Sequence, residues 1–200
     1  MYEFNSAGFR DTEFEKDGIL FFGCSYGFGV GVNTVDRYTN ILETKLNIRC
    51  NNLCIPGSGS DTTARILPYW IEKLQPKIVV NHFMFPIRRE ISNGNQAPTL
   101  WLPSMDLPKT KIQEFIDEDY VYAKTVTNIH SIKNCCKNNS VRYVEYSKNL
   151  NDFNANDSKH PGPESHKQIA NEIFDMIENN RVLQFTNTDD YANKHIYRQT

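Results

Sequence analysis

The sequence predicts an α/β fold, in which a parallel sheet is covered by helices on both faces. Two patterns support this prediction. Short apolar runs typical of buried strands alternate with longer segments whose apolar residues recur at helical spacing. Several of the apolar runs are followed by glycine-, proline- or asparagine-rich turns. Alternating strands and helices favour parallel strands joined by right-handed crossover helices.

Four strands and four helices are predicted along the chain. The strands are expected at residues 19–22, 48–55, 78–83 and 141–146. The helices are expected at about residues 38–46, 60–74, 111–137 and 163–177. Ser60 or Asp61 is expected to cap the second helix, and Pro68 to kink or split it. Pro163 is expected in the first turn of the last helix. No linker-like stretch divides the 200 residues, so we expect one domain over residues 1–200.

Three segments fall outside this alternation. Residues 1–17 are polar with scattered phenylalanines, which predicts an N-terminal arm packed by its aromatic side chains against the body. Residues 86–110 contain four prolines and predict a long loop over the active face. Residues 181–200 form a polar C-terminal tail that the pattern does not place.

Charge and hydropathy exclude several classes of partner. The chain has 22 Lys+Arg and 24 Asp+Glu, a formal charge of -2, and no dense basic run, so neither nucleic acid nor an anionic membrane surface is expected as a partner. No apolar run approaches the ~20 residues of a membrane span, and the N-terminus does not resemble a signal peptide. We therefore expect a cytoplasmic protein. The oligomeric state cannot be read from these patterns.

The cysteines indicate neither a disulfide framework nor a metal site. There are five, an odd number without regular spacing, which favours a reducing compartment. Cys50 and Cys54 have no second pair of ligands spaced for zinc, so we interpret them as buried structural thiols. No metal and no cofactor are expected.

Ser25 is the candidate nucleophile. It follows the first predicted strand in a glycine-rich turn, and a serine hydroxyl needs a base to take its proton. Asp157 and His160 supply such a pair at a spacing of three residues, so that a single turn can direct the carboxylate to one imidazole nitrogen. Ser25, Gly57 and residues 157–160 each follow a predicted strand, and ligands bind beyond the carboxyl ends of parallel strands.

The developing negative charge of an acyl oxygen needs preorganised donors. The backbone N–H groups of Ser25 and Gly57 are the candidates for this oxyanion hole. Gly57 and Gly59 are also explained by a turn that needs positive φ, and both interpretations can hold for one residue.

Three other interpretations compete with a catalytic serine. Gly23-x-Ser25-x-Gly27 fits the nucleophile elbow of α/β-hydrolases, but only one strand precedes it here and the acid and base are close in sequence. A phosphate-binding loop would use the same glycines, yet the Lys-Ser/Thr end of a Walker motif is absent. Taken alone, Asp157 and His160 fit a helix-entry loop in which they satisfy backbone groups.

Three motifs together resemble the SGNH (GDSL-like) hydrolase family. They are similar to its blocks I, II and V and read Gly23-Cys-Ser-Tyr-Gly-Phe-Gly29, Asn52-Leu-Cys-Ile-Pro-Gly57 and Asp157-Ser-Lys-His160-Pro. The resemblance implies a flavodoxin-like three-layer α/β/α sandwich with a parallel sheet of four to five strands, the fifth near residues 150–153. It also implies an esterase, acylhydrolase or carbohydrate deacetylase that forms an acyl-enzyme with Ser25, His160 and Asp157.

Two positions depart from the family pattern. Cys24 stands where the family has Asp, a residue that supports the turn. Block III, a Gly-x-Asn-Asp turn that supplies an oxyanion-hole asparagine, is replaced by Phe83-Met-Phe-Pro-Ile-Arg-Arg-Glu90, and Asn81 lies too early, inside the strand. The loss of one such donor can reduce the rate by about 10²–10³. A catalytically silent binding protein of the same fold is therefore the alternative.

The expected substrate is a small-molecule or glycan ester, such as an acetyl group on a carbohydrate. Trp101 and Met105 in the predicted loop face this substrate or pin the loop to the body. Arg88 binds an anionic substrate group or forms a salt bridge to Glu90 or another carboxylate.

Overall fold

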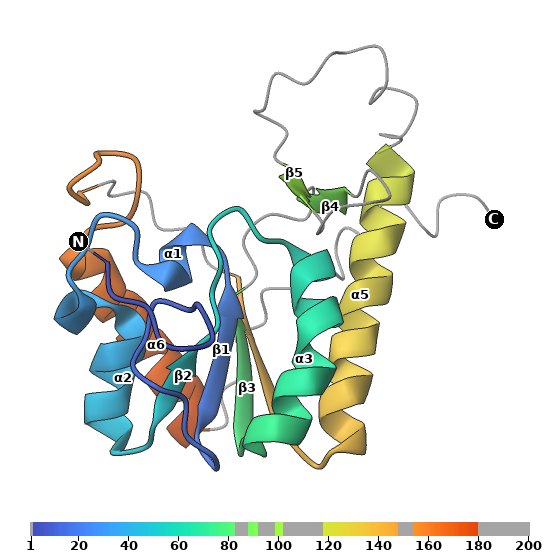
Figure 1. Ribbon diagram of the computed structural model, residues 1–200, viewed down its shortest axis with the longest axis horizontal. Helices are drawn as coiled ribbons and strands as arrows, with labels where there is room; N and C mark the ends of the chain where they lie inside the picture. Colours follow the sequence, from blue (N-terminus) through green and yellow to red (C-terminus); the bar gives the residue numbers. More distant parts are fainter. Residues whose placement is uncertain (1, 83–87, 92–98, 102–117, 148–153, 180–200) are drawn as a thin grey trace.

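Strand β1 (Ile19–Gly23) lies inside a four-stranded parallel sheet of order β2-β1-β3-β6. Its neighbours are β2 (Cys50–Asn52) and β3 (Ile78–His82), and β6 (Arg142–Tyr146) pairs with β3. This computed structural model describes residues 2–82, 88–91, 99–101, 118–147 and 154–179 (Figure 1). Because all four strands are parallel, their carboxyl ends meet at one edge, beside α1 in Figure 1.

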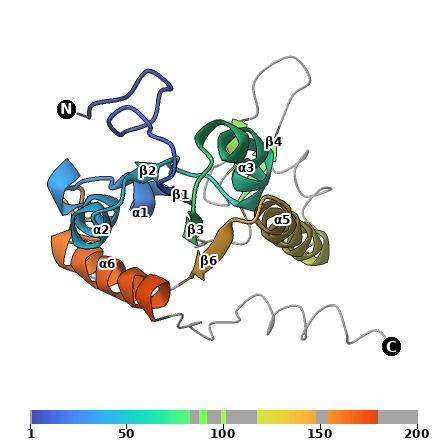
Figure 2. The same cartoon turned by 90° about the horizontal axis from the view of Figure 1, so that it is seen from below.

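The side chains of β1 alternate between two apolar clusters. Ile19 and Phe21 pack with α2 (Tyr38–Leu46) and α6 (Pro163–Glu178) on one face. Leu20 and Phe22 pack with α3 (Ser60–Leu74) and α5 (Glu118–Asn138) on the other. The two helical layers on opposite faces are seen end-on in Figure 2. These four side chains of β1 are each at most 1% exposed, which explains why the strand is apolar on both faces. The predicted α/β fold with a parallel sheet is confirmed.

The main differences from the prediction concern element boundaries and the loop. Strand β2 is shorter than residues 48–55. Helix α3 runs through Pro68 without interruption, so the predicted split is wrong. Residues 86–110 are not all loop, because β4 (Arg89–Ile91) and β5 (Thr99–Trp101) form an antiparallel pair. Strand β4 is tied to α3 because the backbone N–H of Glu90 donates to Asp61 Oδ2 at 3.1 Å.

Pro163 begins α6 as predicted, and α5 begins at Glu118, while residues 111–117 lie outside the described residues. The proposed fifth strand near residues 150–153 and the tail 181–200 also lie outside them. Within the described part of the chain, no helix has the length and apolar character needed to cross a membrane.

The N-terminal arm packs against the body through its aromatic residues, as predicted. Phe9 and Phe14 lie against Trp70 of α3, with ring centroids 5.6 and 5.2 Å from the indole. The arm also carries polar residues into the body, at Arg10 and Asp11, which are 4% and 8% exposed. The sequence pattern gave no reason to expect these buried charges.

Candidate active site

Ser25 is the first residue of α1 (Ser25–Phe28), a single helical turn that follows directly on the end of β1. The residue is 7% exposed, and its Oγ lies 4.0 Å from Cys24 Sγ. The turn ends at Gly29, whose φ of 76° is the left-handed conformation that glycine adopts without a steric penalty. The short helix therefore places Ser25 at the carboxyl edge of the sheet.

Asp157 and His160 form a hydrogen-bonded pair. Asp157 Oδ2 is 2.5 Å from His160 Nδ1, and Asp157 Oδ1 accepts the backbone N–H groups of Lys159 at 3.0 Å and His160 at 3.1 Å. Burial acts to raise the pKa of Asp157, but the hydrogen bonds from Lys159 and His160 outweigh it and lower this pKa. An ionised carboxylate fixes the imidazole orientation and leaves Nε2 as the nitrogen for proton transfer.

The loop that carries this pair is docked on the segment after α1. The backbone N–H of Asn156 donates to the carbonyl of Gly31 at 3.0 Å. A Cβ on Gly31 would lie 2.8 Å from Ala155 Cβ, so only glycine permits this approach. The His160 ring stands edge-on to Tyr26, with centroids 5.9 Å apart and an interplanar angle of 76°. The structure thus brings His160 against Tyr26, the residue that follows Ser25. As the structure describes them, His160 and Ser25 form no direct hydrogen bond.

Gly57 lies at the same edge, in the loop between β2 and α3. Its φ is 80°, as the turn interpretation predicted. The neighbouring Ser58 ties this loop to β1, because its Oγ donates to the Gly23 carbonyl at 2.7 Å. Among the described residues, the backbone N–H groups of Ser25 and Gly57 donate no hydrogen bond.

The chain after β3 returns to this loop at Arg88. A Cβ on Gly59 would lie 2.6 Å from the Arg88 carbonyl oxygen, so the two backbones are in close contact. Glu90 pairs with Arg65 at 2.7 Å. Trp101 is the last residue of β5, and its side chain, like all of Met105, lies outside the described residues.

A buried group of aromatic and histidine rings lies next to Tyr26, with His82 as its central member. This residue ends β3, is 1% exposed, and its Nδ1 is 3.3 Å from Tyr38 Oη. Its ring contacts Tyr26 and Tyr146, with centroids 6.3 and 4.9 Å away. His166 stacks on Tyr38, with the ring centroids 5.8 Å apart. His82, at the end of β3, therefore packs against Tyr26 from the central sheet.

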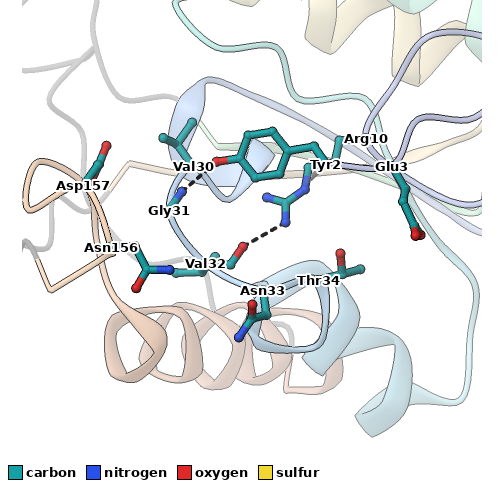
Figure 3. Close-up of a pocket in the computed structure, with 10 residues that line it drawn as sticks. All are labelled: Tyr2, Glu3, Arg10, Val30, Gly31, Val32, Asn33, Thr34, Asn156 and Asp157. Atoms are coloured by element: carbon teal, nitrogen blue, oxygen red, sulfur yellow. Dashed lines mark hydrogen bonds between the residues drawn. The ribbon is translucent and has the colours of Figure 1, made fainter.

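A cavity of about 580 Å³ lies beside the Asp157 loop. Its lining comes from the arm, from the segment after α1 and from the loop, and includes Tyr2, Arg10, Asn33, Asn156 and Asp157 (Figure 3). Ser25 and His160 do not line it. The cavity therefore adjoins the acid of the candidate triad and not its nucleophile.

The buried thiols of the core are poorly suited to act as thiolates. All five cysteines are free, and four of them, Cys135 excepted, are buried. Burial raises the pKa of Cys50 and Cys54 and thereby disfavours their thiolates. Among the described residues, no group of three or more His, Cys, Asp or Glu side chains is arranged to hold a metal ion.

Comparison with known proteins identifies relatives by structure alone. No protein-family model and no curated protein matches the chain. A carbohydrate esterase, whose active site is described as displaying divergent catalytic and non-catalytic binding functions, is 12% identical with a TM-score of 0.54, over 84% of this chain and 67% of that one. A psychrotrophic esterase from Pseudoalteromonas sp. is 16% identical with a TM-score of 0.45, over 80% and 96% of the two chains. A family two carbohydrate esterase from Clostridium thermocellum is 16% identical with a TM-score of 0.44, over 85% and 66%. The likeness to the first of these shows that the chain shares the α/β fold of that protein.

Proposed function

We propose that this protein is a serine-dependent ester hydrolase of the SGNH type, with Ser25 as nucleophile, His160 as general base and Asp157 as its orienting acid. The observation that supports this most is the Asp157–His160 pair, hydrogen-bonded at 2.5 Å and packed on Tyr26, the neighbour of Ser25. The pair reaches the neighbour of Ser25 from a segment more than 130 residues away in the sequence.

In the proposed reaction, His160 Nε2 takes the proton of Ser25 Oγ as this oxygen attacks the ester carbonyl carbon. The carbonyl π electrons move to the oxygen, which the N–H groups of Ser25 and Gly57 stabilise. The intermediate collapses, the alcohol leaves with the proton from His160, and the acyl group stays on Ser25. Water, deprotonated by His160, then attacks the acyl-enzyme and releases the acid, which restores Ser25.

The substrate in this proposal is an acyl ester of a small molecule or glycan. A second candidate function, binding without catalysis, is favoured by the absence of the block III Gly-x-Asn-Asp sequence after β3. The carbohydrate esterase of the same fold, whose active site is described as having both kinds of function, shows that one such site can serve either purpose.

Fluorophosphonate labelling of the purified protein separates the two functions. Labelling is expected on Ser25, located by mass spectrometry, and it should disappear in Ser25→Ala and fall by about 10³-fold or more in His160→Ala. His130→Ala is the matched control, because His130 lies exposed on α5. If the wild type is not labelled and hydrolyses neither short-chain aryl esters nor acetylated sugars, binding without catalysis is the correct function.

A further inference from the structure

The short helix that carries Ser25 needs support from other parts of the chain. A single turn is not stable by itself, because helix nucleation fixes several residues for each hydrogen bond formed. Within α1 and its cap, Gly29 and Val30 donate to the Ser25 carbonyl at 3.0 and 3.1 Å. Past these bonds, the Gly29 carbonyl accepts the backbone N–H of Val32 at 3.3 Å, and the carbonyls at the end of the helix, from Gly27 onward, also need donors from side chains.

Two side chains supply those donors. Asn52 Nδ2 donates to the Gly27 carbonyl at 2.9 Å. Arg10 of the N-terminal arm donates through Nη1 to the carbonyls of Phe28, at 3.0 Å, and Gly29, and through Nη2 to that of Val32 at 2.8 Å. A guanidinium also suits the negative end of a helix. One arginine therefore binds three carbonyls at and just after the C-terminal end of the Ser25 helix.

Arg10 is itself held in place. The Tyr2 ring covers its guanidinium at 4.1 Å, and Tyr2 Oη accepts the backbone N–H of Gly31 at 3.0 Å (Figure 3). On the other side, Arg37 Nη1 donates to the Arg10 carbonyl. Arg10 thus joins the arm to the same segment, around Gly31, on which the Asp157 loop docks.

The next residue, Asp11, supports the second donor. Its Oδ2 accepts the backbone N–H of Asn52 at 2.8 Å and pairs with Arg49 at 3.0 Å, while Oδ1 lies 3.4 Å from Arg37 Nη2. Asn52 in turn holds the Gly27 carbonyl through its side chain. Two adjacent residues of the arm therefore reach the Ser25 helix by separate routes.

We infer that Arg10 and Asp11 are positioning residues, which hold the α1 turn so that Ser25 faces its base and the oxyanion donors. This inference rests on the proposed function. Neither residue contacts the reacting atoms in this scheme, so their loss should lower the rate of the chemical step and leave substrate binding nearly unchanged.

Arg10→Ala tests the inference, with Arg142→Ala as the matched control. Arg142 also donates to carbonyls at the end of a helix, those of Met176 and Ile177 in α6, at 2.7 Å each. Arg10→Ala is expected to slow fluorophosphonate labelling of Ser25 by about 10- to 100-fold. Arg142→Ala should change labelling less than about twofold at a comparable loss of thermal stability. Arg10→Lys, which cannot reach three carbonyls at once, should label at an intermediate rate and serves if the alanine variant does not fold.

Hydrogen exchange by mass spectrometry gives a readout that does not depend on catalysis. Amides of residues 25–32 should exchange faster in Arg10→Ala and Asp11→Asn, whereas Arg142→Ala should affect only the end of α6. Unchanged exchange in residues 25–32, or labelling as fast as in the wild type, would overturn the positioning role. If the wild type is never labelled, the proposed function fails by itself, and the exchange pattern still decides whether Arg10 and Asp11 hold this turn.

Discussion

The imidazole of His160 rests edge-on against the phenol ring of Tyr26, with the ring centroids 5.9 Å apart. The Tyr26 ring in turn packs against His82, the last residue of β3. The proposed base therefore contacts a ring that packs on the central sheet. Tyr26 therefore links the segment of the proposed nucleophile to that of the proposed base.

Removal of this ring should therefore slow labelling of Ser25 by more than any loss of thermal stability explains. Tyr26→Leu is expected to lower the labelling rate by about 10-fold or more, because the imidazole loses its lateral contact. Tyr26→Phe retains the ring and should lose much less. Labelling kinetics and thermal unfolding of both variants check this prediction, and equal rates in the two would contradict it.

The Asp157 carboxylate predicts a defined pH dependence. Its pKa is lowered below the ordinary 3.8 in the folded protein, so folding favours the ionised form. The stability that Asp157 contributes is therefore fully present above the unfolded pKa, and it is lost as the pH falls through the lower folded pKa. We expect the difference in unfolding free energy between the wild type and Asp157→Asn to be constant above about pH 5 and to shrink below about pH 4. Urea unfolding from pH 3 to 7 measures it, and a difference that widens toward acid would refute the assignment.

Gly27 should tolerate no side chain. A Cβ there would lie 2.2 Å from Cys54 Sγ and 2.6 Å from Tyr38 Oη. Gly27→Ala is expected to cost about 1–3 kcal/mol of unfolding free energy by overpacking. Cys54→Ala removes the nearer atom and should recover part of this loss in the double variant. Denaturant unfolding of the four proteins of this cycle gives the coupling, and simple additivity would rule out the clash.

The cysteines should react in two groups. Burial raises the pKa of Cys136 to about 12 and also raises those of Cys50, Cys54 and Cys135, but the Cys135 side chain is only half-buried. In the native protein at pH 8, a thiol reagent such as DTNB is therefore expected to modify Cys135 first and the buried thiols only on unfolding. Cys135→Ser should abolish the fast phase. Rapid modification of several thiols in that variant would show that the core opens readily.

Much of the fold follows from local patterns. The apolar run of β1 and the helical spacing in α6 predict their elements because burial imposes period and composition residue by residue. Strand β2 is shorter than the predicted residues 48–55, although the N–H groups of Leu53 and Ile55 still donate to the carbonyls of Phe21 and Gly23 in β1, at 2.8 and 2.9 Å. Strands β4 and β5 have three residues each and depend on contacts from α3, which no local pattern contains.

The candidate site divides in the same way. Ser25, Asp157 and His160 stand in recognisable motifs because their chemistry requires particular residues at short spacings. Arg10 and Asp11 have partners 18 to 41 residues away, so nothing near them in the sequence indicates their role. The role of such buried charges can be inferred only from the fold, which brings their partners together.

The contacts that secure the Ser25 turn have a consequence for biosynthesis. Arg10, Asp11, Asn52 and the turn itself all belong to the first 54 residues, whereas His160 is made more than 100 residues later. A growing chain therefore contains all of these supporting residues well before it contains the proposed base. Under the proposed mechanism, hydrolysis begins only after the segment with α6 has been made and the His160 loop docks on Gly31.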